Sequence, residues 1–381
     1  TAGARAVMRG LLAREGLQGL IARDAHAQLT DAFLMENRRH GVSLLGAPNA
    51  TGGAARCPST SLDDAPGPRD CFTRVSIQCN GVAALYVDGA RTLDLSRVSL
   101  SGTRAVDGTS GDGLFAGHGA RVTLDADIDS DRLQGMGSAL IANARAGVLA
   151  RDEGTSVSVR GALVASNGGP GVFVGTMAAA PEVAYSLLEG NTALGLGATA
   201  SALLGAIQCN GITATRMGML PTSAGSLLLG DGLSLVDTRG DVSVQANEVT
   251  GNARFAGLFA GARGNVSANR GRANGYGLAV YASPALTLAA DNRVEGAIRF
   301  DTRDISLGGA FLRSDLLFEV GEELEVDFDL PGASAAIRVK ARVVRVARGG
   351  TGSKEQAGMG IAFSDLSERD REAMRAAIDR A

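Results

Sequence analysis

The sequence predicts an all-β protein in two parts: a solenoid of stacked short strands, then a small β-barrel that ends in one helix. Three observations lead to this fold class. A unit of Asn, a short spacer, Gly and apolar residues recurs before residue 290. Gly accounts for 53 of 381 residues and Trp is absent, which disfavours a large core filled with aromatic side chains. Charged residues rise from about 16% before residue 290 to about 34% after it.

The recurring unit has the period of a stacked repeat. Three of its glycines, Gly147, Gly171 and Gly195, are spaced by 24 residues, and strand-like alternation such as Val157-Ser158-Val159 lies between units. Such a repeat cannot bury its own apolar face, so successive turns must stack. Asn at the same corner of successive turns can form a hydrogen-bonded ladder. The unit begins at Asn37, Asn143, Asn167, Asn191, Asn252 and Asn274.

These repeats resemble the right-handed parallel β-helix family. We assign the repeats to residues 1–290, which allows roughly a dozen turns at about 22 residues per turn. Copies are poorly defined at residues 46–112 and 210–245, where we expect insertions or irregular turns. The sequence is already in mid-repeat at its start, so we expect no intact N-terminal cap within it.

Net charge and hydropathy exclude two classes of partner. Forty acidic and 37 basic residues give a net charge of −3, which provides no basic field for nucleic acid. Two uncharged runs, residues 161–181 and 191–215, contain Asn, Gly and Pro or Gln, so we predict no transmembrane segment. The residues after Thr1 lack the pattern of a signal peptide, and we expect none in this sequence.

The last part of the chain, residues 291–381, predicts a small barrel. Residues 322–330 alternate acidic and apolar side chains, and residues 337–343 alternate basic and apolar ones, so we expect an antiparallel pair with ion pairs across it. Residues 358–363 form a further strand. Ser367, with Asp370 three residues later, resembles a capping box and marks the start of a helix over residues 368–380.

The segment Asp304-Ile305-Ser306-Leu307-Gly308-Gly309, together with this strand order and helix, resembles the PilZ domain family over about residues 293–381. The resemblance implies a bacterial receptor for the second messenger cyclic di-GMP, without catalysis and without a bound cofactor or metal. It is a signalling and nucleotide-binding function.

The resemblance implies five ligand-binding residues: Arg299, Arg303, Asp304, Ser306 and Gly309. Arginine suits this ligand, because its planar fork binds phosphate or the O6/N7 edge of guanine bidentately. Ligand-binding family members carry an R-x-x-x-R motif well upstream of D-x-S-x-x-G, whereas here Arg299 to Arg303 directly precedes it. The alternatives are ordinary surface arginines and a tight turn with local hydrogen bonds from Asp304. Arg293 is a second arginine candidate.

Four aspartates, Asp125, Asp127, Asp129 and Asp131, alternate in sequence. On one face of a strand they would form an oxygen-rich row able to bind a cation or a glycan, or to act as a catalytic acidic patch. We favour a solvated outer face, because a fold alone does not imply an activity. We therefore assign no catalytic residue and no metal site.

The cysteines bear on the compartment. Cys57 and Cys71 flank a segment rich in Pro, Ser and Asp, and a disulfide between them would suit an oxidising environment. Cys79 and Cys209 lie in matching Gln-Cys-Asn-Gly contexts, for which we favour buried free thiols. The three histidines, which we expect at the surface or at corners, form no catalytic pattern.

Two functional hypotheses follow. The first is a non-enzymatic bacterial protein in which a β-helix scaffold or binding surface, for a protein or polysaccharide partner, carries a cyclic di-GMP receptor domain. It would be cytoplasmic. The second is a secreted or cell-surface β-helix that binds or cleaves polysaccharide, with a degenerate PilZ-like domain that binds no nucleotide.

Overall fold

The computed structural model describes two compact units, Thr1–Ala297 and Ile298–Ala381. Within them it describes residues 5–47, 69–106, 110–125, 137–175, 177–180, 182–203, 206–222, 225–281, 283, 285–289, 291–294, 301–313, 318–328, 337–347 and 358–378. No helix in these ranges is long and apolar enough to span a membrane.

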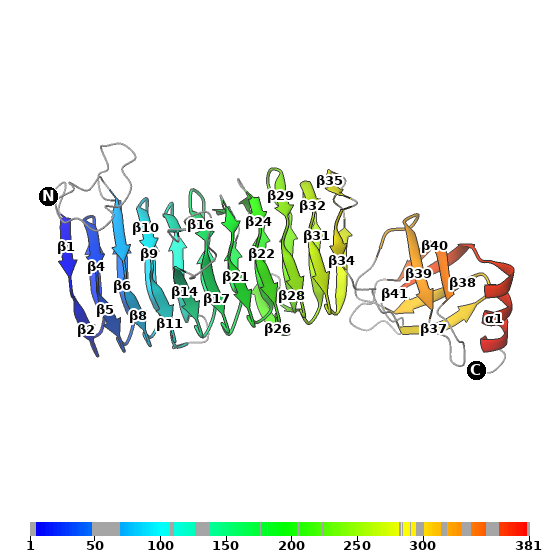
Figure 1. The fold of residues 1–381 in the computed structure, drawn as a ribbon, viewed down its shortest axis with the longest axis horizontal. Coiled ribbons are helices and arrows are strands. Elements are labelled where there is room, and N and C mark those ends of the chain that lie inside the picture. Colours follow the sequence, from blue (N-terminus) through cyan, green and yellow to red (C-terminus); the bar gives the residue numbers. More distant parts are fainter. Residues whose placement is uncertain are drawn as a thin grey trace. The chain divides into compact units, whose positions relative to one another are not determined.

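The first unit is a parallel β-helix. Its strands lie side by side in chain order, and each pairs in parallel with the equivalent strand of the turns before and after it (Figure 1). Three parallel sheets, here called A, B and C, run the length of the unit, so every described turn contributes a strand to each in the order A, B, C until the last. Val294, in the last strand of sheet B, pairs with Gly271, so the β-helix continues past residue 290.

Sheet A contains β1 (Arg5–Arg9), β4 (His26–Thr30), β7 (Asp70–Thr73), β10 (Thr92–Ser96), β13 (Arg121–Asp125), β16 (Ser156–Arg160), β20 (Val183–Ala184), β24 (Ala206–Gln208), β29 (Val242–Gln245), β32 (Gly264–Ser267) and β35 (Leu286–Leu288), with β19 (Ala179–Ala180) and β23 (Ala202–Leu203) beside this path. Sheet B contains β2 (Leu12–Arg14), β5 (Phe33–Met35), β8 (Ser76–Gln78), β11 (Ser99–Ser101), β14 (Ser138–Ile141), β17 (Ala162–Ala165), β21 (Leu187–Glu189), β25 (Gly211–Thr213), β30 (Glu248–Thr250), β33 (Arg270–Arg272) and β36 (Arg293–Val294). Sheet C contains β3 (Leu20–Arg23), β6 (His40–Leu45), β9 (Ala83–Asp88), β12 (Asp112–Gly117), β15 (Val148–Ala150), β18 (Val172–Val174), β22 (Leu194–Thr199), β28 (Asp231–Val236), β31 (Phe255–Ala260) and β34 (Tyr276–Tyr281).

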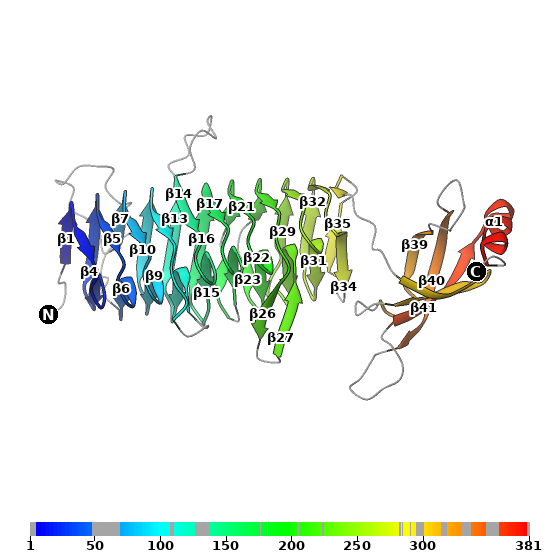
Figure 2. The ribbon, with the colours of Figure 1, turned by 90° about the horizontal axis from the view of Figure 1, so that it is seen from below.

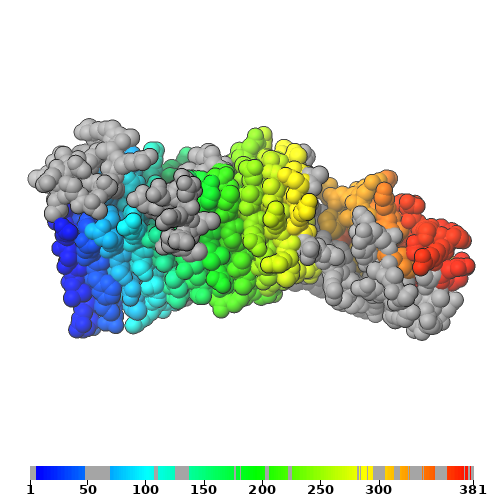
Figure 3. Space-filling model, viewed as in Figure 1, coloured from blue at the N-terminus to red at the C-terminus, as the bar shows by residue number. Residues whose placement is uncertain are grey.

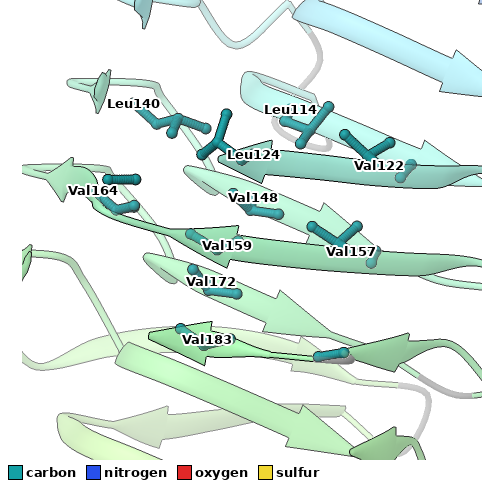
Figure 4. Close-up of a cluster of buried hydrophobic side chains, with 14 of the residues drawn as sticks. Leu114, Val122, Leu124, Leu140, Val148, Val157, Val159, Val164, Val172 and Val183 are labelled. Carbon is teal, nitrogen blue, oxygen red and sulfur yellow. The ribbon is translucent and has the colours of Figure 1, made fainter. Parts of the chain in front are cut away.

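The interior is filled by columns of identical or similar aliphatic side chains. In β-strands alternate residues point to opposite faces, so each short strand supplies one or two apolar side chains to the inside. Leu114, Val148 and Val172 are register partners on successive turns of sheet C and are almost completely buried. Figure 4 shows them beside the equivalent valines of sheets A and B. This narrow interior explains the scarcity of aromatic residues.

Buried asparagines stack at two corners of the β-helix. At the corner between sheets B and C, the Nδ2 of Asn143 donates to Asn167 Oδ1 at 3.0 Å, and the Nδ2 of Asn167 donates to Asn191 Oδ1 at 2.8 Å. Each Oδ1 also accepts a backbone N–H of the preceding turn. The expected ladder is therefore present, and it satisfies buried backbone groups at the corner. All six asparagines of the repeat unit lie in this first ladder.

A second ladder lies at the corner between sheets A and B. Its members Asn210, Asn247, Asn269 and Asn292 are linked by Nδ2 to Oδ1 bonds of 2.9 Å each. The residue before each ladder position commonly adopts a left-handed backbone, as Cys79 and Cys209 do with φ of 53°. Their matching Gln-Cys-Asn-Gly contexts are thus the same turn at two different corners. Both thiols are free, and Cys209 is exposed, so the prediction of burial is wrong there.

The glycine of the repeat unit is required by the next turn. A β-carbon on Gly171 would lie 2.6 Å from the carbonyl oxygen of Gly195 and 2.7 Å from Asn191 Nδ2. Both distances are shorter than a van der Waals contact, and one of the atoms is backbone, which cannot move aside. The regular spacing of Asn and Gly in the sequence therefore arises because this close contact, between the glycine of one turn and the backbone and asparagine of the next, is repeated along the β-helix.

Residues 69–106 form regular turns, so the expectation of irregular structure over residues 46–112 is wrong for that described stretch. The other expected interruption holds a hairpin. Strands β26 (Gly218–Thr222) and β27 (Gly225–Leu229) pair antiparallel between β25 and β28. Figure 2 shows this hairpin projecting from the row of turns. Leu220 and Leu229 pack against Leu194, which anchors the hairpin to sheet C.

The second unit contains an antiparallel sheet of five strands in the order β37 (Asp301–Ser306), β38 (Gly309–Arg313), β41 (Gly358–Asp365), β40 (Ile337–Ala347) and β39 (Glu323–Phe328), followed by α1 (Glu368–Ile378). The predicted strand pair is present: Val326 pairs with Val339, and Arg342 donates to Glu323 across the strands at 2.8 Å. Met374 of α1 is buried in the core of the sheet. In the described residues the two edge strands, β37 and β39, do not pair with each other.

Candidate functional site

In the second unit, the D-x-S-x-x-G segment forms the tight hairpin between β37 and β38. Ser306 pairs with Gly309, which leaves two residues, Leu307 and Gly308, in the turn. The Oγ of Ser306 accepts the Gly308 N–H at 3.3 Å and donates to the Gly309 carbonyl at 3.1 Å. Ser306 thus makes local bonds within this turn, and its hydroxyl stays exposed, whereas the side chain of Asp304 lies outside what the structure describes.

Gly309 is fixed by the neighbouring strand. A β-carbon there would lie 2.1 Å from the carbonyl oxygen of Ile361 in β41. The position of Gly309, which the resemblance implies in ligand binding, is therefore closely approached by a strand of the sheet itself. Gly308 differs, since a β-carbon on it would meet nothing closer than Ser306 Oγ at 3.9 Å. The open side of the turn is at Gly308.

Of the two predicted arginines, Arg303 lies at the entry to this hairpin. The register between β37 and β38 shifts between Thr302 and Asp304, so Arg303 is the extra residue of a β-bulge. Bulges of this kind redirect a side chain and are common beside functional sites. Arg299 lies outside the described residues, and of the five predicted ligand residues the structure brings Arg303, Asp304, Ser306 and Gly309 together on one hairpin.

In the first unit, an exposed histidine lies between two carboxylates on successive turns. His118 Nδ1 is 2.5 Å from Asp88 Oδ1, and its Nε2 is 3.7 Å from Asp152 Oδ2. The hydrogen bond to Asp88, and then the charges of Asp88 and Asp152, raise the pKa of His118 above its usual value. His118 was expected at a corner and lies at one, directly after β12. Its partners could not be found by spacing, because they are 30 and 34 residues away.

A stack of rings lies on the outer side of sheet C nearby. His40 and Tyr86 have ring centroids 4.7 Å apart, and Tyr86 and Phe115 are parallel within 6° at the same distance. Arg151 continues the stack, 4.9 Å from the Phe115 centroid. These spacings match the distance between strands. His40 begins β6, directly after a corner, so of the two expected positions it has the corner and not the surface; it is buried, and burial lowers its pKa to about 4.

The acidic row is only partly visible. Asp125 is the last residue of β13, whereas Asp127, Asp129 and Asp131 lie outside the described residues. Cys57 also lies outside them, and Cys71 is disulfide-bonded. Within the described ranges, no group of three or more His, Cys, Asp or Glu side chains is arranged to hold a metal ion.

Comparison with known proteins agrees with the hairpin, strand order and helix of the second unit. The model of the PilZ domain matches residues 279–380. This region is a PilZ domain. The match begins within β34, so its first residues are shared with the last turns of the β-helix. No curated protein matches the chain.

The chain is similar to solved bacteriophage structures at low sequence identity. They include the enzymatically active domain of tailspike protein 2 of bacteriophage CBA120, at 9% identity and a TM-score of 0.36, over 91% of this chain and 52% of that one. Full-length tailspike protein 2 from a bacteriophage of Escherichia coli O157:H7 matches at 9% identity and a TM-score of 0.35, over 90% and 46%. The chain thus spans about half the length of these structures.

Proposed function

We propose that the PilZ domain is a cyclic di-GMP receptor and that the β-helix is a scaffold or binding surface to which this receptor is attached. The PilZ match over residues 279–380 is the observation that carries the proposal. The β-bulge places the backbone of Arg303 at the start of a hairpin whose turn is open at Gly308 and carries the exposed hydroxyl of Ser306, and arginine is the residue type that binds an anionic nucleotide. No residue of this hairpin is assigned a catalytic role.

Calorimetric titration of cyclic di-GMP into the full chain tests this function. We expect micromolar binding, about −8 kcal/mol, that is lost in Arg299→Ala and in Arg303→Ala. The matched control is Arg342→Ala, which removes an exposed arginine from the same sheet, where it pairs with Glu323. Absence of heat from the wild-type chain, or an equal loss in the control, would contradict the proposal.

A second candidate function places the β-helix outside the cell, where it binds or cleaves polysaccharide and the PilZ domain binds no nucleotide. The disulfide at Cys71 favours it, because such bonds persist in oxidising compartments. The flanking of His118 by Asp88 and Asp152 also favours it, because paired carboxylates are the usual groups of glycoside cleavage. The row from Asp125 to Asp131 is the other acidic face to which we assign this role.

Thiol titration of the denatured, non-reduced protein separates the two compartments. Cys79 and Cys209 are free, so a secreted protein with one disulfide should show two thiols. Four thiols in protein purified from its native compartment would remove the disulfide argument and favour the cytoplasmic receptor. Loss of glycan turnover in Asp88→Asn and Asp152→Asn, with turnover retained in Asp241→Asn, would identify the cleavage site.

A further inference from the structure

A groove of about 340 Å³ runs along the corner between sheets A and B, over three successive turns. Each turn contributes three consecutive residues to its wall, in the series 74–76, 97–99 and 137–139. The middle residue of each series is buried, so the outer lining consists of Arg74, Arg97, the hydroxyls of Ser76 and Ser99, and the small residues Gly137 and Ala139. The groove is in the β-helix, and no function described above uses it.

The two arginines of the groove differ in what they bind. Arg74 is bound bidentately to Asp31, with Nε 2.6 Å and Nη2 3.0 Å from the two carboxylate oxygens. The guanidinium of Arg97 makes no hydrogen bond or ion pair with any residue of the described ranges, and it is exposed. Arg97 therefore offers the groove an uncompensated positive charge and a free fork of donors.

Ser76 and Ser99, which line the groove, begin strands of sheet B that carry further small polar side chains. Ser76 and Ser99 are register partners, and so are Gln78 and Ser101 on the next outward positions. Gln78 donates to Ser76 at 2.8 Å, while the Oγ atoms of Ser99 and Ser101 have no partner in the described part of the chain. Three hydroxyls and an amide thus lie beside Arg97 on two adjacent turns, where neighbouring strands are about 4.8 Å apart.

We propose that this groove binds a carboxylate-bearing polysaccharide, with Arg97 bound to a carboxylate of the sugar and the Ser76, Ser99 and Ser101 hydroxyls bound to its hydroxyl groups. A bidentate guanidinium–carboxylate pair supplies orientation as well as energy. Neutral hydroxyl and amide groups match a ligand rich in hydroxyls. The wall of the groove spans three successive turns, so a ligand of several sugar units can contact more than one turn. The site deepens the second candidate function, on which it rests.

A polyphosphate ligand fits less well. Nucleic acid binding draws on several Lys and Arg contacts and on a basic surface, whereas this groove has one free arginine and the chain carries a net charge of −3. The pKa of Asp31 is lowered, chiefly by its hydrogen bond to Arg74, so this carboxylate stays ionised at neutral pH and keeps Arg74 occupied. The groove can therefore bind one carboxylate, through the one guanidinium that is free.

The test is calorimetric titration of the full chain with pectate and alginate oligosaccharides of about six residues. Each is paired with its methyl-esterified form, which keeps the hydroxyls but removes the negative charge. The variant is Arg97→Asn, because residue 97 has a left-handed backbone with φ of 55° that Asn tolerates. The matched control is Arg104→Asn, which removes another exposed arginine of the same turn at the next corner. Inorganic phosphate and cyclic di-GMP are run in parallel against both variants.

We expect one or both acidic oligosaccharides to bind, with affinity reduced at least tenfold by esterification and by Arg97→Asn but not by Arg104→Asn. A double Ser99→Ala and Ser101→Ala variant should weaken binding further while leaving the preference for the acidic form. Acidic oligosaccharides that bind with unchanged affinity to Arg97→Asn would overturn the groove while keeping polysaccharide binding. No binding of any oligosaccharide by the wild-type chain would overturn both. Binding of phosphate or cyclic di-GMP that depends on Arg97 would show that the ligand is a phosphate.

Discussion

The β-helix and the PilZ domain are both made of β-strands, but their strands are held by different means. In the β-helix each strand pairs with the equivalent strands of neighbouring turns, and similar buried side chains and ladder asparagines recur on most described turns. In the PilZ domain one small core, closed by Met374 of α1, serves the whole sheet. Figure 3 shows the β-helix as successive bands in chain order, each in contact with its neighbours only. Stability is therefore local in the first unit and shared in the second.

This difference affects where binding sites can arise. The inside of a β-helix is constrained by stacking, whereas its outer faces and corners can vary from turn to turn without loss of the fold. The groove at Arg97 and the cluster at His118 both lie on such variable positions. In the PilZ domain the candidate site is a hairpin whose backbone is itself fixed, by Gly309 against β41.

The largest expected effect is a loss of β-helix stability when a buried ion pair, which is not part of the regular repeat, is broken. Arg91 and Asp70 are both 0% exposed, and the guanidinium donates twice to the carboxylate, at 2.9 and 3.0 Å. Arg91→Met should cost about 3–5 kcal/mol, because a buried carboxylate loses its counterion. Urea unfolding should show a weakened β-helix transition and an unchanged PilZ transition.

The control for Arg91→Met is a second change, Asp70→Asn, in the same chain. It removes the negative charge but keeps an acceptor for the Ala27 N–H, which Asp70 Oδ1 binds at 2.7 Å. The double variant should recover much of the lost stability. If the double variant were as unstable as Arg91→Met, packing of the arginine, and not its charge, would be the stabilising factor. A matching loss in both transitions would contradict the independence of the two units.

The second prediction concerns pH. The folded-state pKa of His40 is about 4, mainly because of burial, against about 6.5 when it is unfolded. Between these values the unfolded chain binds a proton that the folded chain does not, so stability is full above pH 6.5 and is lost as the pH falls towards 4. His40→Phe keeps a ring against Tyr86 and should flatten the fall of the β-helix melting temperature in this window. An identical pH profile in this variant would rule out His40 as the cause.

A smaller effect is expected at the helix of the PilZ domain. Ser367 Oγ accepts the Asp370 N–H at 3.2 Å, as an N-cap does. Ser367→Ala should destabilise this unit by about 1 kcal/mol, while Ser367→Asp should retain the cap. Because α1 packs on the single core, the PilZ transition should shift as a whole. A change confined to helix content, without a shift in the midpoint, would mean that the core does not depend on α1.

The sequence predicted the repeated features of the fold and missed the exceptions. The Asn and Gly positions of the first ladder were readable because the same contact recurs every 22 to 24 residues. The second ladder was not recognised, although Asn247, Asn269 and Asn292 are 22 and 23 residues apart, because the repeat unit was defined on the asparagines of the first corner alone. Arg91 and Asp70 have no fully buried counterpart at the same position of the other described turns, and nothing in their spacing of 21 residues indicates a buried pair.

The candidate sites were predictable to different degrees. The hairpin from Asp304 to Gly309 follows a local motif, so sequence alone placed it correctly on a turn. The His118 cluster and the Arg97 groove join residues of different turns, and finding them requires the register of the stacked strands. The same reason explains why Cys79 and Cys209 were recognised as equivalent turns but not as different corners.

The smallest expected effect is a gain of stability at a gap in the first ladder. Thr215 occupies a ladder position between Asn191 and Asn252, and its N–H donates to Asn252 Oδ1 at 3.0 Å. Its buried Oγ1 has no hydrogen-bond partner in the described part of the chain. Asn at this position could donate to Asn252 and accept from Asn191, as Asn167 does between Asn143 and Asn191, so Thr215→Asn should stabilise the β-helix by about 1 kcal/mol. Thr215→Val, which removes the hydroxyl at nearly equal volume, should be close to neutral and serves as the control. A loss of stability in Thr215→Asn would contradict this prediction. It would mean that the hairpin β26–β27, which follows Thr215, has moved the corner so that an asparagine there cannot reach both ladder neighbours.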